Sequence, residues 1–285
     1  MRVCVLGHRG MLGHVVARYL SEQGCEVAVV QARFTAEKPE AFINEIASAD
    51  PKWCINCIGV KAGPSVTRDQ LFEINALLPR VCAKALKDRS IFLQASTDGV
   101  FRPDGDGRSV AEESDATDDY GTAKGAAEKS VIRAGGIVIR CSIIGPELGE
   151  PRSLLGWLLR QSGEVEGYIN QWWNGLTTLE WAEVCWELMN RQLGTEGPII
   201  QPGTWPAMSK CEVLQLIGKV WGLAVKVRPA EAKDAVDRTL LPTLKRPGLE
   251  HQLSRLRDWY ESGKPAGTSR QANAETSAPA RPSSA

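Results

Sequence analysis

The chain has 285 residues, enough for one large α/β domain or for a nucleotide-binding domain with a smaller companion. Basic and acidic residues number 34 each, so the net charge is zero and excludes a broad basic surface for nucleic acid or an anionic membrane. No apolar run approaches the ~20 residues of a membrane span, and a glycine-rich turn follows the first six residues where a secretory signal would continue. We therefore expect a cytoplasmic protein with reduced cysteines and a small-molecule substrate.

Short apolar runs alternate with helical patterns over the first half of the chain, as in βαβ units that build a parallel sheet. Strands are predicted at residues 2–6, 26–30, 53–58, 91–95 and 136–140. Helices are predicted at residues 13–23, 39–48, 69–87 and 120–133. The runs VCVL and IVI are continuously apolar, which is typical of parallel strands buried on both faces. The expected fold is α/β, a Rossmann-type doubly wound parallel sheet over residues 1–146.

The pattern becomes less regular after residue 146, and eight of the nine tryptophans lie beyond residue 150. Helices are predicted there at residues 154–161, 179–191 and 210–221. We expect residues 147–261 to form a smaller substrate-binding region, partly interleaved with the sheet. Residues 262–285 are rich in Ser, Ala and Pro and lack an apolar period, which predicts a disordered tail.

A glycine-rich turn, GHRGMLG at residues 7–13, follows the first strand and opens the first helix. Gly7 allows a tight turn, Gly10 lets the backbone approach a diphosphate, and Gly13 lets the helix pack close to the sheet. The N–H groups at the start of the helix favour an anion. The turn therefore predicts a dinucleotide site. Its expected contacts are Gly7, Arg9, Gly10, Met11, Leu12 and Gly13, with Cys57, Ile58 and Gly59 after the third strand and Ala95 on the fourth.

Cofactor choice is set where the second strand ends, because an acid there accepts the ribose hydroxyls and a base accepts a 2′-phosphate. The stretch VQAR at residues 30–33 contains no acid. Arg33, together with Arg9, suits a phosphate. We expect NADPH as the cofactor, with NADH as the alternative. Arg33 could equally be a solvent-exposed loop residue without a role in binding.

Tyr120 and Lys124 are spaced to share one face of a helix. A tyrosine has an ordinary pKa near 10, and a neighbouring cation lowers it towards use at neutral pH. We predict that Lys124 lowers the pKa of Tyr120 and binds the nicotinamide ribose. Ser96 and Thr97 lie at the end of the preceding predicted strand. The hydroxyl of Thr97, or of Ser96, is expected to hydrogen-bond the substrate oxygen that Tyr120 protonates. The competing interpretation of both hydroxyls is loop capping.

A metal or redox site is not expected. Cys54 and Cys57 form a CxxC, but an odd spacing on a strand points the two side chains to opposite faces. The three histidines lie far apart in the sequence without ligand spacing.

Six motifs together resemble the extended short-chain dehydrogenase/reductase family, in the branch similar to dTDP-4-dehydrorhamnose reductase. They cover the chain to about residue 240 and read GHRGMLG, INCIG, STDGVF, YGTAK, IRCSIIGPE and WWNGLTTLEWA. The resemblance implies a catalytic triad of Thr97, Tyr120 and Lys124. It also implies reduction of the 4-keto group of a nucleotide-linked deoxysugar. Separately, a homodimer is the candidate assembly.

Two positions that border the sugar pocket depart from that branch. Gly99 stands where an aromatic residue is usual, and Ile143 stands where a tryptophan is frequent. These departures leave the sugar and the nucleotide open. The residues expected to contact substrate are Thr97, Asp98, Ile143, Asn170 and Trp173, with Trp172, Asn174 and Thr177 as further lining or as packing.

Epimerases and dehydratases of this fold share the motifs described above. Dehydratases usually carry Thr-Asp-Glu where this chain has Thr97-Asp98-Gly99, which favours a reductase. A nucleotide-binding regulatory subunit without turnover is the remaining alternative, and the intact Tyr120 and Lys124 count against it.

Overall fold

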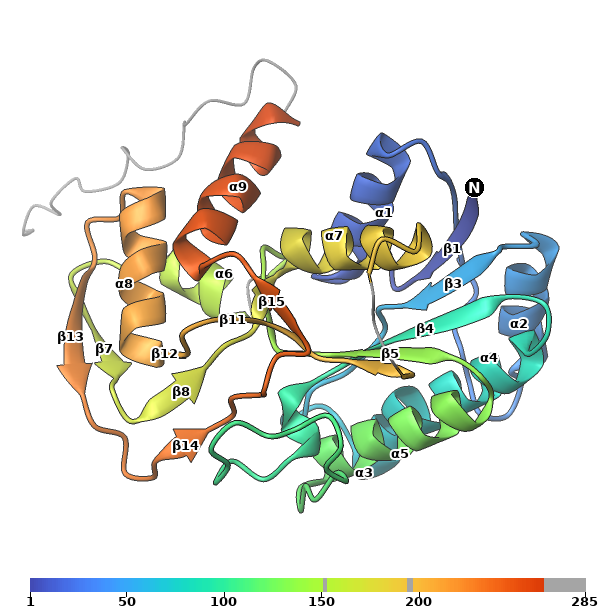
Figure 1. The fold of residues 1–285 in the computed structure, drawn as a ribbon, viewed down its shortest axis with the longest axis horizontal. Helices are drawn as coiled ribbons and strands as arrows, with labels where there is room; N and C mark the ends of the chain where they lie inside the picture. Colours follow the sequence, from blue (N-terminus) through green and yellow to red (C-terminus); the bar gives the residue numbers. More distant parts are fainter. Residues whose placement is uncertain (151–152, 194–196, 264–285) are drawn as a thin grey trace, which may run out of the picture.

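The computed structural model describes residues 1–150, 153–193 and 197–263, and its centre is one parallel sheet of six strands (Figure 1). The strand order is β10-β5-β4-β3-β1-β2. The bounds are β1 Arg2–Leu6, β2 Glu26–Val29, β3 Trp53–Asn56, β4 Ile91–Ser96, β5 Ile137–Arg140 and β10 Ile199–Ile200. The predicted α/β Rossmann-type architecture is confirmed. Because β2 and β3 lie on opposite sides of β1, a crevice opens at the carboxyl ends of β1 and β3.

Alternate residues of the strands enter two separate hydrophobic cores. Val3 and Val5 belong to one core, whereas Cys4 and Leu6 belong to the other. Figure 1 shows the helices that cover the two faces of the sheet. One face carries α1 (Gly13–Glu22) and α7 (Thr178–Met189); the other carries α2 (Glu40–Ser48), α3 (Arg68–Phe72), the π-helical turn η1 (Glu73–Leu77), α4 (Leu78–Leu86) and α5 (Asp119–Arg133). Burial on both faces explains the continuous apolar strands.

Residues beyond the fifth strand form small sheets and three more helices (Figure 1). The paired strands are β6 (Ile143–Ile144) with β9 (Leu176–Thr177), β7 (Glu164–Tyr168) with β13 (Lys226–Ala230), β11 (Pro202–Thr204) with β15 (Leu244–Arg246), and β8 (Gln171–Trp173) with both β12 (Met208–Ser209) and β14 (Val236–Asp237). The helices are α6 (Leu154–Leu158), α8 (Lys210–Trp221) and α9 (Leu249–Ser262). Because β10 joins the central sheet and α7 packs on α1, this region is interleaved with the first.

One predicted helix differs from the structure, and one helix of the structure was not predicted. The helix predicted at residues 69–87 is instead α3, η1 and α4 in succession. Pro79 has no N–H to donate to the carbonyl of Asn75, and the π-helical turn before it accommodates that loss. Helix α9 was not predicted, although Leu249, Leu253 and Leu256 bury one face of it. It includes Ser262, where the tail was expected to begin; residues 264–285 lie outside the described residues.

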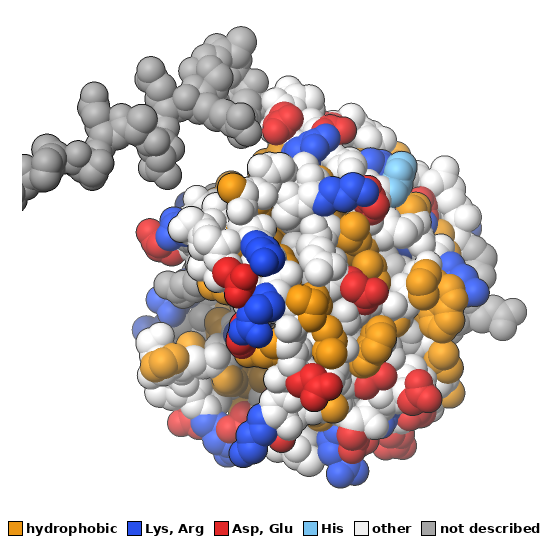
Figure 2. Space-filling view, turned by 90° about the vertical axis from the view of Figure 1, so that its left-hand side faces the viewer, with side chains coloured by type: hydrophobic (Ala, Val, Ile, Leu, Met, Phe, Trp, Pro, Cys, Tyr) orange, Lys and Arg blue, Asp and Glu red, His pale blue; other side chains and the backbone are white. Residues whose placement is uncertain are grey.

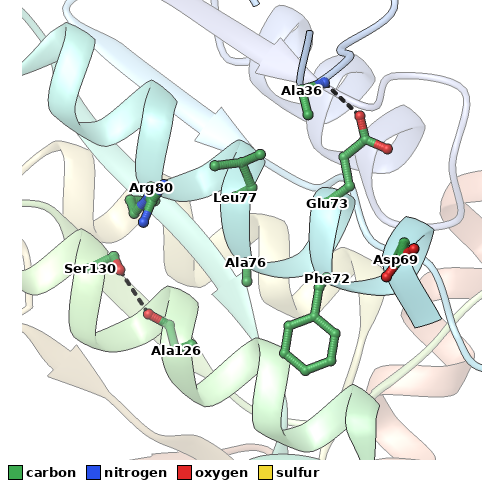
Figure 3. Close-up of a pocket in the computed structure, with 9 residues that line it drawn as sticks. All are labelled: Ala36, Asp69, Phe72, Glu73, Ala76, Leu77, Arg80, Ala126 and Ser130. Carbon is green, nitrogen blue, oxygen red and sulfur yellow. Dashed lines mark hydrogen bonds between the residues drawn. The ribbon is translucent and has the colours of Figure 1, made fainter.

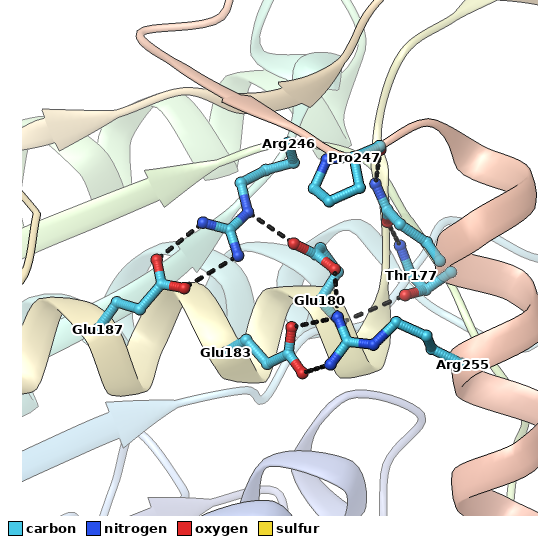
Figure 4. Close-up of polar contacts among 8 residues, drawn as sticks. Thr177, Glu180, Glu183, Glu187, Arg246, Pro247 and Arg255 are labelled. Atoms are coloured by element: carbon cyan, nitrogen blue, oxygen red, sulfur yellow. Dashed lines mark hydrogen bonds and ion pairs between the residues drawn. The ribbon is translucent and has the colours of Figure 1, made fainter.

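Helix α7 is joined to the C-terminal segments by a network of acids and arginines (Figure 4). Arg246 of β15 donates to Glu180 at 2.6 Å and to Glu187 at 2.7 Å. Arg255 of α9 pairs with Glu183. The Glu180 side chain is only 1% exposed, so its carboxylate depends on these partners. The network holds β15 and α9 against the helix that packs on α1.

None of the described helices combines the length and the hydropathy that a bilayer crossing requires.

We predict that Arg246→Met lowers the free energy of unfolding by about 3 kcal/mol, because it leaves a buried carboxylate without its principal partner. Arg228→Met is the matched control. Arg228 also contacts two carboxylates, Glu164 and Glu166, but its side chain is 51% exposed, and its loss should cost less than about 1 kcal/mol. Urea unfolding of both variants measures the difference; equal losses would contradict this view of the network.

Candidate active site and dinucleotide crevice

The glycine-rich turn lies at the crevice between β1 and β3. Gly7 has φ +81°, and a Cβ there would lie 2.9 Å from the Ile58 side chain. The Gly10 N–H donates to the Gly7 carbonyl at 2.8 Å. A Cβ on Gly13 would collide with the same carbonyl, so the start of α1 rests directly on the turn. Each glycine thus permits a close approach of backbone to backbone.

The start of α1 offers main-chain donors to an anion. Its N-cap is Leu12, whose side chain makes no capping hydrogen bond and is buried in the core. Leu12 therefore faces the crevice only through its backbone, while Met11 is half-buried and Arg9 and Gly10 are exposed. Uncapped N–H groups beside a glycine turn fit the diphosphate of a dinucleotide.

The loop after β3 forms the opposite wall of the crevice. Asn56 is buried; it donates to Gln94 at 2.8 Å and accepts from the Ile58 N–H at 3.1 Å. Asn75 of η1 clamps Val60 through two hydrogen bonds of 3.0 and 2.8 Å. Cys57 and Ile58 are half-buried and Gly59 is exposed. Asn75 escaped the sequence-based prediction, although an amide four residues from buried Leu71 on a helix was a usable signal.

The two arginines proposed to select the cofactor lie in the glycine turn, for Arg9, and just after β2, for Arg33. Arg9 donates to Gln31 at 3.1 Å, which brings the glycine turn and the second strand together. Arg33 is exposed. Glu45 of α2 accepts from the N–H groups of Gln31 and Ala32, each at 2.8 Å. The carboxylate of Glu45 thus binds the backbone after β2 and does not replace the missing acid of residues 30–33. Arg9 and Arg33 carry the side-chain charge here.

Tyr120 lies against the turn that follows β4. A Cβ on Gly121 would collide with the Gly99 carbonyl, so the glycine lets the start of α5 touch the short helix η2 (Asp98–Val100). A Cβ on Gly99 would lie 3.4 Å from both the Tyr120 ring and the Thr97 hydroxyl. Thr97 and Tyr120 are therefore neighbours. Thr97 also caps η2 by accepting from the Gly99 N–H at 3.0 Å, so the capping role holds together with the proximity.

The predicted effect of Lys124 on Tyr120 is wrong. Burial, followed by the charge of Asp98, raises the pKa of Tyr120 to about 12, against smaller lowering effects of Thr97 and Arg238. The ammonium of Lys124 donates to the Ala95 carbonyl at 2.6 Å instead of acting on the phenol. Burial lowers the pKa of Lys124 itself to about 8, although the carboxylate of Glu128 opposes the change.

A buried network decides between the two candidate hydroxyls. Ser96 donates to Glu128 at 2.5 Å, and Glu128 accepts two further bonds from Arg140 at 2.9 and 2.6 Å. Arg140 continues to Gln201 at 2.8 Å. The Ser96 hydroxyl is thereby committed to the interior. Thr97 is the hydroxyl beside Tyr120.

Cations from distant segments converge on the same place. The charges of Arg238 and Lys210 lower the pKa of Asp98, opposing the larger effect of burial, which raises it. Burial lowers the pKa of Lys210, and the charges of Arg238 and Lys61 lower it further, opposed by Asp98. Arg238 also donates to the Phe101 carbonyl at 3.3 Å. The two cations beside Asp98 make this end of the crevice suited to an anionic ligand. Sequence reasoning missed Arg238 and Lys210, since nothing near them in the chain marks a site.

The residues of the WWNG segment mainly hold the structure together. The amide of Asn170 donates to and accepts from the backbone of Ala232 at 2.8 and 2.9 Å. Asn174 pairs in the same way with Leu240. Trp173 belongs to the main core, Thr177 is fully buried, and Trp172 is exposed. Ile143 of β6 is half-buried against that core. Of the predicted substrate contacts, the structure brings Asp98 and Thr97 together with Tyr120.

A groove on the outer face of α3, η1 and α5 is separate from these residues (Figure 3). Phe72 and Ala76 point into it, and the Glu73 carboxylate above it accepts from the Ala36 N–H at 2.6 Å.

The cysteines offer no reactive centre. Burial raises the pKa of Cys54 and of Cys57, which keeps both thiols protonated. In the described part of the chain, no three His, Cys, Asp or Glu side chains gather as metal ligands would.

Comparisons with known proteins agree with this geometry. Residues 3–185 match the model of the NAD dependent epimerase/dehydratase family. No curated protein sequence matches the chain. Among solved structures, the dTDP-4-dehydrorhamnose reductase of Bacillus anthracis in complex with NADP is similar with TM-score 0.78 at 18% identity, over 90% of this chain and 99% of that one. The corresponding reductase of Clostridium acetobutylicum gives 0.74 at 19%, over 92% and 100%. A UDP-glucuronic acid 4-epimerase from Bacillus cereus, in complex with NAD, gives 0.69 at 14%, over 92% and 99%.

Proposed function

The chain belongs to the NAD dependent epimerase/dehydratase family, and we propose that it is a cytoplasmic NAD(P)H-dependent reductase of the 4-keto group of a nucleotide-linked deoxysugar. Its partners are then the cofactor and the nucleotide sugar, with neither nucleic acid nor membrane, and a homodimer is the candidate assembly. Two comparisons support the proposal: the match to a family of NAD dependent enzymes, and the similarity in fold to dTDP-4-dehydrorhamnose reductases.

The observation that carries the proposal is the position of the Tyr120 hydroxyl group beside Thr97, just after the carboxyl end of β4. With a pKa of about 12, the Tyr120 hydroxyl keeps its proton at neutral pH and is a donor rather than a base. An alkoxide formed by reduction is a stronger base than this phenolate, so the proton moves to the substrate. Tyr120 can therefore serve as the proton donor that reduction of a carbonyl requires.

The residues of the chain have distinct tasks in this reaction. Reduced nicotinamide, when bound, supplies the hydride. Tyr120 gives its proton to the carbonyl oxygen, and Thr97 and Arg238, the two groups that lower its pKa, stabilise the phenolate that remains. Lys124, as an ammonium, holds the nicotinamide ribose. The glycine turn holds the diphosphate of the cofactor, with Gly7, Gly10 and Gly13 permitting the approach.

The cations at the end of the crevice fit the substrate side. Lys210 and Arg238 place positive charge beside Asp98, and Lys61 acts on Lys210, as a site for a nucleotide diphosphate requires. Gly99 leaves the side of the Tyr120 ring open to a sugar. Asp98 followed by Gly99, without a second acid, favours a reductase over a dehydratase.

We expect Tyr120→Phe to lower kcat by about 10²- to 10⁴-fold with cofactor affinity nearly unchanged, because it removes the proton donor alone. The assay follows NADPH oxidation with a panel of nucleotide 4-keto sugars, and product analysis detects epimerisation or dehydration. Tyr168→Phe is the control, since Tyr168 lies exposed on β7. Retention of most activity by Tyr120→Phe, or no turnover of any panel member by the wild type, would refute the proposal.

The pH dependence should follow Lys124. Its ammonium is present below a pKa of about 8 and is lost as the pH rises through that value. We therefore expect kcat/KM for the cofactor, which reports the free protein, to fall above about pH 8. Lys124→Arg, less active overall, should lack this decline because a guanidinium stays charged. A profile that is level to pH 9.5 in the wild type would show that the charge of Lys124 is not required.

Arg33 provides the test of cofactor preference. If its guanidinium pairs with a 2′-phosphate, Arg33→Ala should weaken NADPH by about tenfold and leave NADH unchanged. Arg133→Ala, at the far end of α5, is the control for loss of one charge. Fluorescence titration with both dinucleotides measures the effect, and equal weakening of the two would remove the basis for preferring NADPH.

A further inference from the structure

The C-terminal helix α9 reaches the glycine turn through one pair of side chains. His14, in the first turn of α1, bonds the Gly10 carbonyl through Nδ1 at 2.7 Å. Its Nε2 meets the hydroxyl of Tyr260 on α9. The two rings lie edge to face with centroids 5.9 Å apart. A residue 246 positions away thus contacts, through one imidazole, the backbone of the proposed cofactor site.

The chemistry of the two acceptors fixes the proton on His14. A carbonyl oxygen only accepts, so Nδ1 must carry the hydrogen. Burial lowers the pKa of His14, which favours the neutral ring, and its Nε2 is then an acceptor. Burial raises the pKa of Tyr260 to about 12, so its hydroxyl remains a donor. Tyr260 therefore selects the tautomer that binds Gly10, as the second partner of a histidine generally does.

The bond to Gly10 has a consequence for the donors of the turn. The Gly10 carbonyl also accepts from the His14 N–H at 3.2 Å, so it is directed towards α1. In a planar trans peptide the C=O and the N–H point in opposite directions. The Met11 N–H, in the same peptide unit, is thereby directed away from α1. Fixing this carbonyl orients a donor for the diphosphate.

We propose that Tyr260 is a positioning residue for the cofactor: by holding His14 on the Gly10 carbonyl, it keeps the glycine turn in the shape that binds the dinucleotide. The inference rests on the proposed function, because it assumes that the turn binds NAD(P)H. It extends the set of residues that shape the cofactor site to the C-terminal helix α9.

The rest of the contact between α1 and α9 provides a matched control. Trp259, the neighbour of Tyr260, donates through Nε1 to Glu22 at 2.6 Å, and the Arg18 guanidinium lies 3.8 Å above its ring. Trp259→Phe removes one hydrogen bond between the same two helices while keeping an aromatic ring. Its hydrogen bond lies at Glu22, at the far end of α1 from the turn, and the substitution keeps an aromatic ring beside Tyr260, whose ring lies edge to face with that of Trp259 at 5.4 Å between centroids.

The test compares NADPH dissociation constants of the wild type, Tyr260→Phe and Trp259→Phe by fluorescence titration. Tyr260→Phe should raise the constant by about two- to tenfold, the value of one hydrogen bond, with kcat at saturating cofactor unchanged. Both variants should lower the melting temperature by similar amounts, because each loses one hydrogen bond between α1 and α9. Trp259→Phe should leave the NADPH dissociation constant unchanged. In a double-mutant cycle, His14→Phe should raise the constant at least as much, and adding Tyr260→Phe to it should have no further effect.

Amide hydrogen exchange over residues 7–14 of the cofactor-free protein separates this inference from the proposed function. Tyr260→Phe should accelerate exchange there, and Trp259→Phe should not. If the wild type binds no dinucleotide, the proposed function fails, whereas faster exchange in Tyr260→Phe alone still supports the role of Tyr260 in holding the glycine turn; unchanged exchange in that variant overturns this role. If the wild type binds and both variants weaken binding equally, or neither does, only the role of Tyr260 is overturned.

Discussion

Tyr120, Lys124 and Glu128 follow one another at intervals of four on a single face of α5, and the anchoring of Glu128 sets the rotation of that helix. A buried carboxylate must be paired, and Glu128 is held by Arg140 from β5 and Ser96 from β4. With Glu128 fixed on Ser96, the next turn places Lys124 on Ala95. The turn before that places Tyr120 beside Thr97 and Gly99. The end of β4 and the turn after it therefore contact three successive turns of α5.

This arrangement explains why the proton donor and the cation of the site behave differently from isolated side chains. The same packing that aligns α5 on β4 leaves Tyr120 half-buried and buries Lys124. Burial then raises the pKa of one and lowers the pKa of the other. The carboxylate of Asp98 adds to the effect on Tyr120, and the cations contributed after residue 200 partly compensate for Asp98. The electrostatics of the site depend on both parts of the chain.

Helix α7 links these two parts. It packs on α1 along one face of the sheet, and its three glutamates bind arginines of β15 and α9. Through α9 the same contacts reach back to α1, where Tyr260 meets His14. Two contacts therefore support the glycine turn. Gly13 packs against the Gly7 carbonyl, and Tyr260 of α9 contacts His14, which bonds the Gly10 carbonyl. Helix α9, which carries no sequence motif, thus contacts the glycine-rich turn at residues 7–13 through His14.

The sequence alone was sufficient for the features that depend on neighbouring residues. The apolar runs predicted the five main strands, because burial on both faces requires continuous hydrophobicity. The glycine spacing predicted the turn at residues 7–13, because only glycine tolerates those approaches. The spacing of Tyr120 and Lys124 predicted a shared helix face. Only the tertiary structure decided that Ser96 is internal, that Tyr120 has a raised pKa, that Arg238 and Lys210 join the site, and that α9 touches the turn. Burial and electrostatic fields arise from segments far apart in the chain, and no local period or turn signal encodes which of them meet.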